Sequence, residues 1–516
     1  MAANSLKLDV KEDNPMCHHR ICTQLVISIG IGLVMAGCAA VGPDYRPVTP
    51  DAPERWHAEM GGGLIAAPPE PDALAGWWST FEDRALSRLM EQAASGNLSI
   101  QTARARVREA RALRGISRAG LFPSVDAGAS AARLRSSESG GTGRESEFYS
   151  AGFDAGWELD IFGGVRRSIE AAQADLEASR EELNGVLITL MAEVALNYVD
   201  MRTFQARLTT TAANIKTLEN SYLLNQSRYQ AGLIDELALQ ESVRILETAR
   251  SQMPVLETGL SAAKNRLAVL LGKQPGQLAQ ELEEKAPIPA LPARVAVGIP
   301  AEMLRRRPDV KRAERDLAAQ TARIGVATAE LYPKFRLAGT IGLEAVDSGA
   351  FLEQGSRVWG FGPSAYWNIF DAGAIRQKIN AQTARQEQAL IRYQATVLAA
   401  QEEVENALVA YAKEQIRGDS LVKAAAAAKR AELLAAHRYQ MGLVGFNNVL
   451  DAQRALLGRQ LAARQRDHDR VVATQQDVDH DDLADGDPEL GVHELIHRDG
   501  FLRGRWRMQP ASLVAA

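Results

Sequence analysis

The sequence predicts a mainly α-helical protein with a membrane β-barrel, assembled as a trimer from chains that each contain a tandem duplication. Three observations support this prediction. Segments 210 residues apart resemble one another, two proline-free segments of 67 residues are rich in helix formers, and short runs alternate apolar and polar residues. Three chains with four strands each would give a twelve-stranded β-barrel, continued by a twelve-helix α-barrel.

The duplication is visible in matches that keep one offset along the chain. RYQAGL at 228–233 corresponds to RYQMGL at 438–443, and the offset of 210 holds from about residue 103 to 244. Chance does not preserve one register through such different segments. We therefore predict two repeats, at 83–272 and 301–472.

The segment 273–300 lies between the repeats and contains five prolines. Proline at this density interrupts a continuous helix. We expect an extended strap that joins the two halves.

Three helices are expected in each repeat. The first ends at a Leu-aromatic-Pro sequence, because the residue before proline leaves helical geometry. The second would reach roughly 100 Å if unbroken, at 1.5 Å per residue. The third returns antiparallel, so each repeat becomes a rod with strands at one end and the hexamer at the other. The expected helices are 83–120, 164–230 and 236–271 in the first repeat, and 301–330, 374–440 and about 447–472 in the second.

Two strands about a polar loop are expected between the first and second helices of each repeat. From Tyr149 to Leu159 alternate residues are apolar, among them Phe153 and Trp157. Such strands are typical of transmembrane barrels, although a hairpin packed on the helices is an alternative. A closed membrane barrel needs about eight strands, so several chains must share it. The expected strands are 124–134, 149–159, 335–343 and 359–369.

The N-terminal residues 1–37 resemble a secretory signal peptide, with Met16 as a possible true start. The stretch Met-Ala-Gly-Cys ends at Cys38 and resembles a lipoprotein cleavage site, after which the cysteine is lipidated. A plain signal anchor with a chance cysteine is the alternative. Residues 38–82 would then form a lipid-anchored N-terminal segment, and the mature chain would hold no disulfide.

Charge and motifs argue against other classes of function. The net charge is −5, and no basic patch with interleaved aromatic residues indicates nucleic acid. The tail at 473–516 contains HELIH from His493 to His497, a formal zinc-peptidase motif. Its flanking glycines leave a segment too short for a third ligand and a substrate cleft. We expect no enzyme, no catalytic residue, no metal and no cofactor.

Three stretches carry a resemblance to a known family. They are CAAVGPDYRPV from Cys38, WWSTFEDRALSRLMEQA at 77–93 and LRRRPDVKRAERDLAAQTARIGVATAELYP at 304–333. The chain resembles the outer-membrane efflux (TolC-like) family, in its lipoprotein branch related to OprM, from Cys38 to about residue 470. The family's usual C-terminal Lys-Ala-Leu-Gly-Gly-Gly-Trp-like stretch is missing, which predicts a divergent or frameshifted tail.

The resemblance implies a homotrimeric channel in the cell outer membrane, held by lipid and extending into the periplasm. Its partners would be a periplasmic adaptor (membrane fusion) protein and an energised inner-membrane pump. The channel would passively conduct small molecules, such as drugs and toxic compounds, to the exterior. A lipid-anchored coiled-coil scaffold without a pore is the alternative function, and the amphipathic hairpins with Trp157 and Trp367 argue against it.

The resemblance also implies functional residues at the far tips. Tyr439 and Asp451 match positions that constrict the pore in relatives, whereas Asn448 replaces a second acid and so argues against a double acidic ring. Glycine in each hexamer would permit the positive φ of a tight helical turn. A hexamer that merely closes the turn is the alternative. The positions that match the adaptor-docking pattern are Arg228, Gly232, Leu233, Arg438, Gly442 and Leu443.

Overall fold

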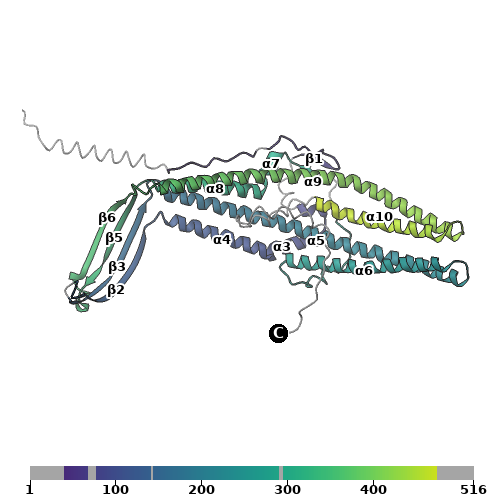
Figure 1. Ribbon diagram of the computed structural model, residues 1–516, viewed down its shortest axis with the longest axis horizontal. Helices are drawn as coiled ribbons and strands as arrows, with labels where there is room; N and C mark the ends of the chain where they lie inside the picture. The colour runs from purple at the N-terminus through teal and green to yellow at the C-terminus, as the bar shows by residue number, and fades with distance from the viewer. Residues whose placement is uncertain (1–39, 51, 68–76, 141–142, 290–294, 474–516) are drawn as a thin grey trace, which may run out of the picture.

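The computed structural model describes residues 40–50, 52–67, 77–140, 143–289 and 295–473. The molecule is a long rod with a β-sheet at one end and two helical turns at the other (Figure 1). The predicted signal peptide, Met16, Cys38 and the HELIH motif lie outside the described residues. Within the described ranges, no helix combines the length and the apolar composition that crossing a bilayer requires.

Two long helices form the spine of the rod. Helix α5 (Gly164–Gln230) and helix α9 (Ala374–Gln440) contain 67 residues each, with the bounds predicted from the sequence. Each follows a glycine with positive φ, 78° at Gly163 and 88° at Gly373. Amides at each start donate to a preceding carboxylate, Asp160 or Asp371. A carboxylate at a helix N-terminus satisfies free N–H groups and complements the helix dipole.

Shorter helices stack end to end along each long helix, as expected (Figure 1). Along α5 these are α4 (Leu98–Ala119), α3 (Arg84–Gly96) and α6 (Glu236–Leu270). Along α9 they are α8 (Pro308–Ala329), α7 (Pro300–Arg306) and α10 (Phe446–Ala473).

The first helical stretch of each repeat is divided into two helices, a division that was not predicted from the sequence. The breaks are at Asn97 and Arg307, which both have φ −62° and extended ψ values of 134° and 130°. Asn97 accepts a hydrogen bond from Ile100 N and donates to Leu270 O, which ties the break to the end of α6. Arg307 precedes Pro308, and a residue before proline avoids helical geometry.

The four long strands form one antiparallel sheet with the order β2-β3-β5-β6. Strand β6 ends earlier than predicted, because Tyr366 pairs with Lys334, the first residue of β5, and the pairing stops there. The sheet comprises β2 (Ser124–Arg135), β3 (Glu145–Leu159), β5 (Lys334–Ala345) and β6 (Arg357–Tyr366).

Matched hydrogen bonds tie the sheet to the helices in both repeats. The indole of Trp157 donates to Leu121 O, and the indole of Trp367 donates to Leu331 O, each over 3.0 Å and 36 residues. Each carbonyl belongs to the Leu-aromatic-Pro sequence that ends α4 or α8. The two halves therefore join sheet to helix through the same contact.

The strap between the repeats is extended only in part. Leu278 and Leu282 are buried against α3, α5 and α6, in a stretch of hydrogen-bonded turns. The expectation of an extended strap was wrong there, because these leucines bury in the core and most of the prolines come later. Further on, β4 (Val295–Val297) pairs in parallel with β1 (Leu64–Ala66).

The main hydrophobic core lies midway along the rod, where α3 and α6 meet on α5. Its centre includes Leu86, Met90, Val194, Tyr198 and Leu267, none of which is measurably exposed. Burial of such side chains contributes about 1.5–3 kcal/mol each. This core holds the rod together without a disulfide among the described residues.

Candidate functional sites at the two ends of the rod

The sheet has one apolar face and one polar face. Phe153, Ile341 and Trp359 lie in one cross-strand row, and 58%, 64% and 74% of their surfaces are exposed in the single chain. The adjacent row, which points to the opposite face, contains Asp154 and Thr340. Strands that alternate in this way place an apolar face against lipid and a polar face against water.

The edges of this sheet are open in the single chain. Strands β2 and β6 lie at opposite edges, and neither pairs with another described strand on its outer side. An open edge presents unpaired N–H and C=O groups, which a hydrocarbon environment does not tolerate. One chain therefore supplies a segment of a barrel rather than a closed barrel.

Two facing glycines bring the central strands close together. A Cβ atom built on Gly152 would lie 2.8 Å from Ile341 O, and one built on Gly342 would lie 2.6 Å from Ala151 O. Both glycines are on the polar face. Their lack of side chains permits the sheet to bend toward that face, as closure into a small barrel requires.

The N-terminal segment is held where the sheet meets the helices. Arg167, in the first turn of α5, is 4% exposed and donates to Val41 O, Asp44 Oδ1 and Glu170 Oε2 over 3.0, 2.6 and 2.7 Å. These contacts fix the chain only a few residues after Cys38.

The two turns at the far end have the same backbone. Gly232 and Gly442 both have φ 72°, and the positive φ expected of these glycines is observed. Leu233 N donates to Arg228 O, and Leu443 N donates to Arg438 O, each over 2.9 Å. This hydrogen bond closes the helix in the way that a C-terminal glycine allows.

The leucines of both turns are exposed. Leu233 is 72% exposed and Leu443 is 68% exposed. Arg438 is also exposed. Each tip therefore presents an apolar side chain that the chain itself does not cover.

The tyrosines of the two hexamers differ in their surroundings. Tyr229 is 40% exposed, whereas Tyr439 is 8% exposed. The Tyr439 hydroxyl donates to Asn225 Oδ1 over 2.9 Å, and the Arg228 guanidinium carbon lies 4.4 Å from the centre of its ring. Phe446 packs on the same ring, with centroids 5.2 Å apart. These contacts join α9 to α5, so the second tip is fastened to the helix of the first.

Asp451 is exposed to solvent at the second tip. Its side chain is 74% exposed and approaches Arg454 Nη1 at 3.5 Å, one turn along α10. Arg454 also lies 3.9 Å from Glu241 on α6. The positive charge of Arg454 partly compensates the negative charges of both carboxylates. The sequence did not predict a role for Arg454 or for Asn225. The comparison of the two repeats does not single out Asn225, because the corresponding residue 210 positions later is Ala435.

An amphipathic barrel segment at one end of paired 67-residue helices defines a subunit of a barrel-and-tube channel. The sequence profile of the outer membrane efflux protein family matches residues 89–273 and 299–476. The chain belongs to this family, as the sequence resemblance predicted. It has the TolC-like fold, in which a β-barrel is continued by a helical barrel, and it is a channel protein rather than an enzyme.

The chain matches its relatives over nearly all of their length. Nodulation protein T of Rhizobium leguminosarum bv. trifolii is 32% identical over 433 residues, which cover 82% of this chain and 90% of that protein. Outer membrane protein OprJ of Pseudomonas aeruginosa is 30% identical over 492 residues, which cover 92% of this chain and 98% of OprJ.

Solved structures agree with the assignment of the chain to this family. The outer-membrane channel OprN is 36% identical with a TM-score of 0.79, over 85% of this chain and 98% of OprN. The open state of the MtrE outer membrane channel of Neisseria gonorrhoeae is 28% identical with a TM-score of 0.73, over 85% of this chain and 98% of MtrE. These matches support an outer-membrane efflux channel as the role of the chain.

Proposed function

We propose that three copies of this chain form the outer-membrane channel of a tripartite efflux system and conduct small molecules passively to the exterior. The amphipathic sheet with two open edges is the observation that carries this proposal. Pairing of β2 in one copy with β6 in the next would satisfy every edge and give twelve strands. The energy for transport would come from a partner pump, because relatives such as TtgC of Pseudomonas putida are named as outer membrane proteins of efflux pumps.

The lipid anchor would be Cys38, held against the outer membrane. Arg167 holds residues 41 and 44 at the junction of sheet and helices, which is where a barrel meets the membrane surface. A lipid attached a few residues earlier would therefore reach the same leaflet as the end of the barrel. This placement favours the lipoprotein interpretation of the N-terminus.

The two tips would receive the periplasmic adaptor. Leu233 and Leu443 are exposed apolar side chains on turns of identical backbone, and an apolar side chain on a rigid turn is a suitable anchor for a facing helix pair. Gly232 and Gly442 would set the shape of the turns. Arg438 would add a charge that the chain leaves exposed, whereas Arg228 is engaged with the Tyr439 ring and would dock only after that contact opens.

The second tip would form the constriction of the pore. Tyr439 fastens α9 to α5 through Asn225, and Asp451 lies exposed nearby on α10. In a trimer these side chains would repeat three times around the axis. Separation of Tyr439 from Asn225 would then widen the exit for cargo, which the names of relatives such as the toluene efflux protein TtgC of Pseudomonas putida suggest to be small organic compounds.

Single-channel recording of the purified full chain in a planar bilayer tests this proposal. Discrete conductance steps are the expected result. Well-folded trimers that stay electrically silent, under voltage and at several salt concentrations, would favour the scaffold without a pore. Chemical crosslinking in membranes provides the independent measure of whether three chains assemble.

A further inference from the structure

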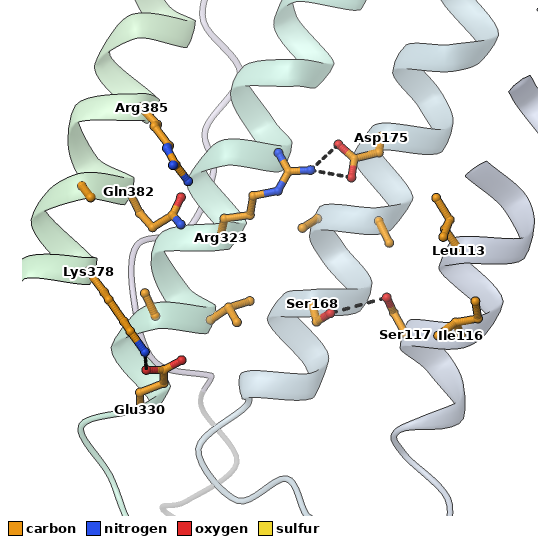
Figure 2. A pocket seen from close by; sticks show the side chains of 15 residues that line it. Leu113, Ile116, Ser117, Ser168, Asp175, Arg323, Glu330, Lys378, Gln382 and Arg385 are labelled. Atoms are coloured by element: carbon orange, nitrogen blue, oxygen red, sulfur yellow. Dashed lines mark hydrogen bonds and ion pairs between the residues drawn. The ribbon is translucent and has the colours of Figure 1, made fainter. Parts of the chain in front are cut away.

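A groove of about 570 Å³ lies across four helices at the sheet end of the rod. Helices α4, α5, α8 and α9 supply its lining, and Figure 2 shows charged side chains from three of these helices in one space. The volume is in the range of sites that bind small organic molecules. None of its lining residues belongs to the sheet, to the contacts of Arg167 or to the two tips.

The groove lies on the face of the helices opposite to the N-terminal segment. On α8, a Cβ built on Gly325 would lie 2.9 Å from Val41 O, so this side of the helix touches the N-terminal segment. Arg323 lines the groove two residues earlier, which is about 200° around the helix. In the proposed trimer a segment anchored by lipid would lie outside the tube, because its lipid would be in the bilayer around the barrel. The opposite face of these helices, with the groove, would then face the lumen.

Two ion pairs inside the groove cancel their own charges. Arg323 donates from Nη2 to both oxygens of Asp175, at 2.8 and 2.7 Å. Lys378 Nζ donates to Glu330 Oε2 at 2.9 Å. Both pairs leave the groove neutral at these positions and hold their side chains in place.

Arg385 adds a positive charge that no described residue neutralises. It is exposed, it lines the groove from α9, and it makes no ion pair or hydrogen bond within the described part of the chain. Figure 2 shows its guanidinium group directed toward Gln382 and Arg323. The groove therefore carries a net charge of +1 in each copy. Further along the same face, Arg312 and Arg392 lie near Asp316, beside the pair of Arg323 and Asp175.

The uncharged lining is mainly apolar, with Gln382 near the arginine and the hydrogen-bonded pair Ser117 and Ser168 near Ile116 as its polar members. Small aliphatic side chains form its floor beside the arginine, and larger ones close its far end on α4, where Leu113 is 54% and Ile116 is 69% exposed. The floor residues are Ala171, Ala172, Val326, Ala327 and Ala381. A cationic end joined to an apolar floor complements an elongated molecule with an anionic head and an aliphatic body.

We propose that this groove is a lumenal binding site for elongated amphipathic organic anions, with the anionic head on Arg385 and the apolar body along the floor toward Ile116. The proposal rests on the channel proposed above and names the class of cargo that the channel favours. A guanidinium group binds a carboxylate or sulfonate through charge-assisted hydrogen bonds, which are stronger than neutral ones. In a trimer, three such sites would surround the passage just before the barrel.

Equilibrium dialysis of the purified full chain in neutral maltoside micelles tests the site with 1-decanesulfonate. Wild type should show saturable binding above the micelle background. Arg385→Gln should weaken this binding about tenfold, as expected for loss of a hydrogen bond to a charged group, and Arg385→Lys should retain most of it. Decyltrimethylammonium, which has the same chain and the opposite charge, should show no saturable binding.

Arg376→Gln is the matched control. Arg376 is an exposed arginine on α9, nine residues before Arg385, so it points to the opposite side of the helix. The Arg376→Gln variant should bind 1-decanesulfonate as tightly as wild type does. Equal binding by wild type and Arg385→Gln, or equal binding of the cationic probe, would overturn the site.

Conductance of the same proteins separates this proposal from the proposed function. Wild type and Arg385→Gln should both conduct in potassium chloride, because the variant keeps the pore. Conduction without saturable binding of 1-decanesulfonate would refute the site alone. Specific binding by a trimer that never conducts would refute the channel alone.

Discussion

Replacing Tyr439 with phenylalanine tests whether the two tips are fastened by one hydroxyl group. Tyr439→Phe keeps the ring between Arg228 and Phe446 and removes only the 2.9 Å hydrogen bond to Asn225. Asn225 is fully buried, and its amide nitrogen already has no partner among the described residues. The substitution would leave the whole amide group unpaired in the closed tips.

The size of the effect follows from the cost of an unpaired buried group. That cost is about 1–3 kcal/mol, which shifts an equilibrium between fastened and separated tips about 5- to 150-fold. When the two tips separate, Asn225 is exposed to water. Its amide group can then bind water, so the separated arrangement avoids the free-energy cost of an unpaired buried group. We expect Tyr439→Phe to favour wide tips.

Single-channel recording measures this shift as the fraction of time spent at high conductance. Tyr229→Phe is the matched control, because Tyr229 occupies the corresponding position of the first hexamer and is 40% exposed. The control should behave as wild type. An unchanged open fraction in Tyr439→Phe, or an equal increase in Tyr229→Phe, would refute the fastening role of the hydroxyl.

Three further predictions concern the other parts of the rod. Arg167→Ala should cost about 1–3 kcal/mol and release the N-terminal segment, which limited proteolysis would detect as new cleavage near residue 44; protection equal to wild type would contradict the clamp. Ile341→Arg should cost about 2–4 kcal/mol in the bilayer and reduce the yield of membrane-inserted protein, whereas Thr340→Arg, on the opposite face, should insert normally; equal losses would contradict the assignment of the faces. The double variant Leu233→Asp with Leu443→Asp should abolish crosslinking to an adaptor without changing conductance; retained crosslinking would place the docking surface elsewhere.

The long elements were predictable because local signals mark their ends. Helices α5 and α9 begin after a glycine and end at a glycine-containing hexamer, and no proline interrupts them. The break at Arg307 also has a local cause in Pro308. The break at Asn97 depends in addition on a hydrogen bond to Leu270 O, 173 residues away, which no local pattern reveals.

The site was predictable only in outline. The turn geometry follows from Gly232 and Gly442, whose conformation is a local property of the chain. Burial of Tyr439 depends on packing against Asn225, 214 residues away, and the corresponding Tyr229 remains exposed. Two copies of one hexamer therefore acquire different surroundings through tertiary contacts alone.

The paired tryptophan contacts at the base of the rod have a mechanical consequence. Trp157 and Trp367 clamp each half of the chain at the same point, while both turns at the far end are free of the sheet. The two halves pack on each other through α5 and α8 and are joined at Tyr439 and Asn225, so the helices would tilt together about the base of the rod. A tilt of about 5° at the root of a helix that is roughly 100 Å long displaces its end by roughly 9 Å. Small rotations where the sheet meets the helices would therefore open or close the channel at the distant tips. The strength of the tryptophan contacts would set the force that the adaptor must apply to move them.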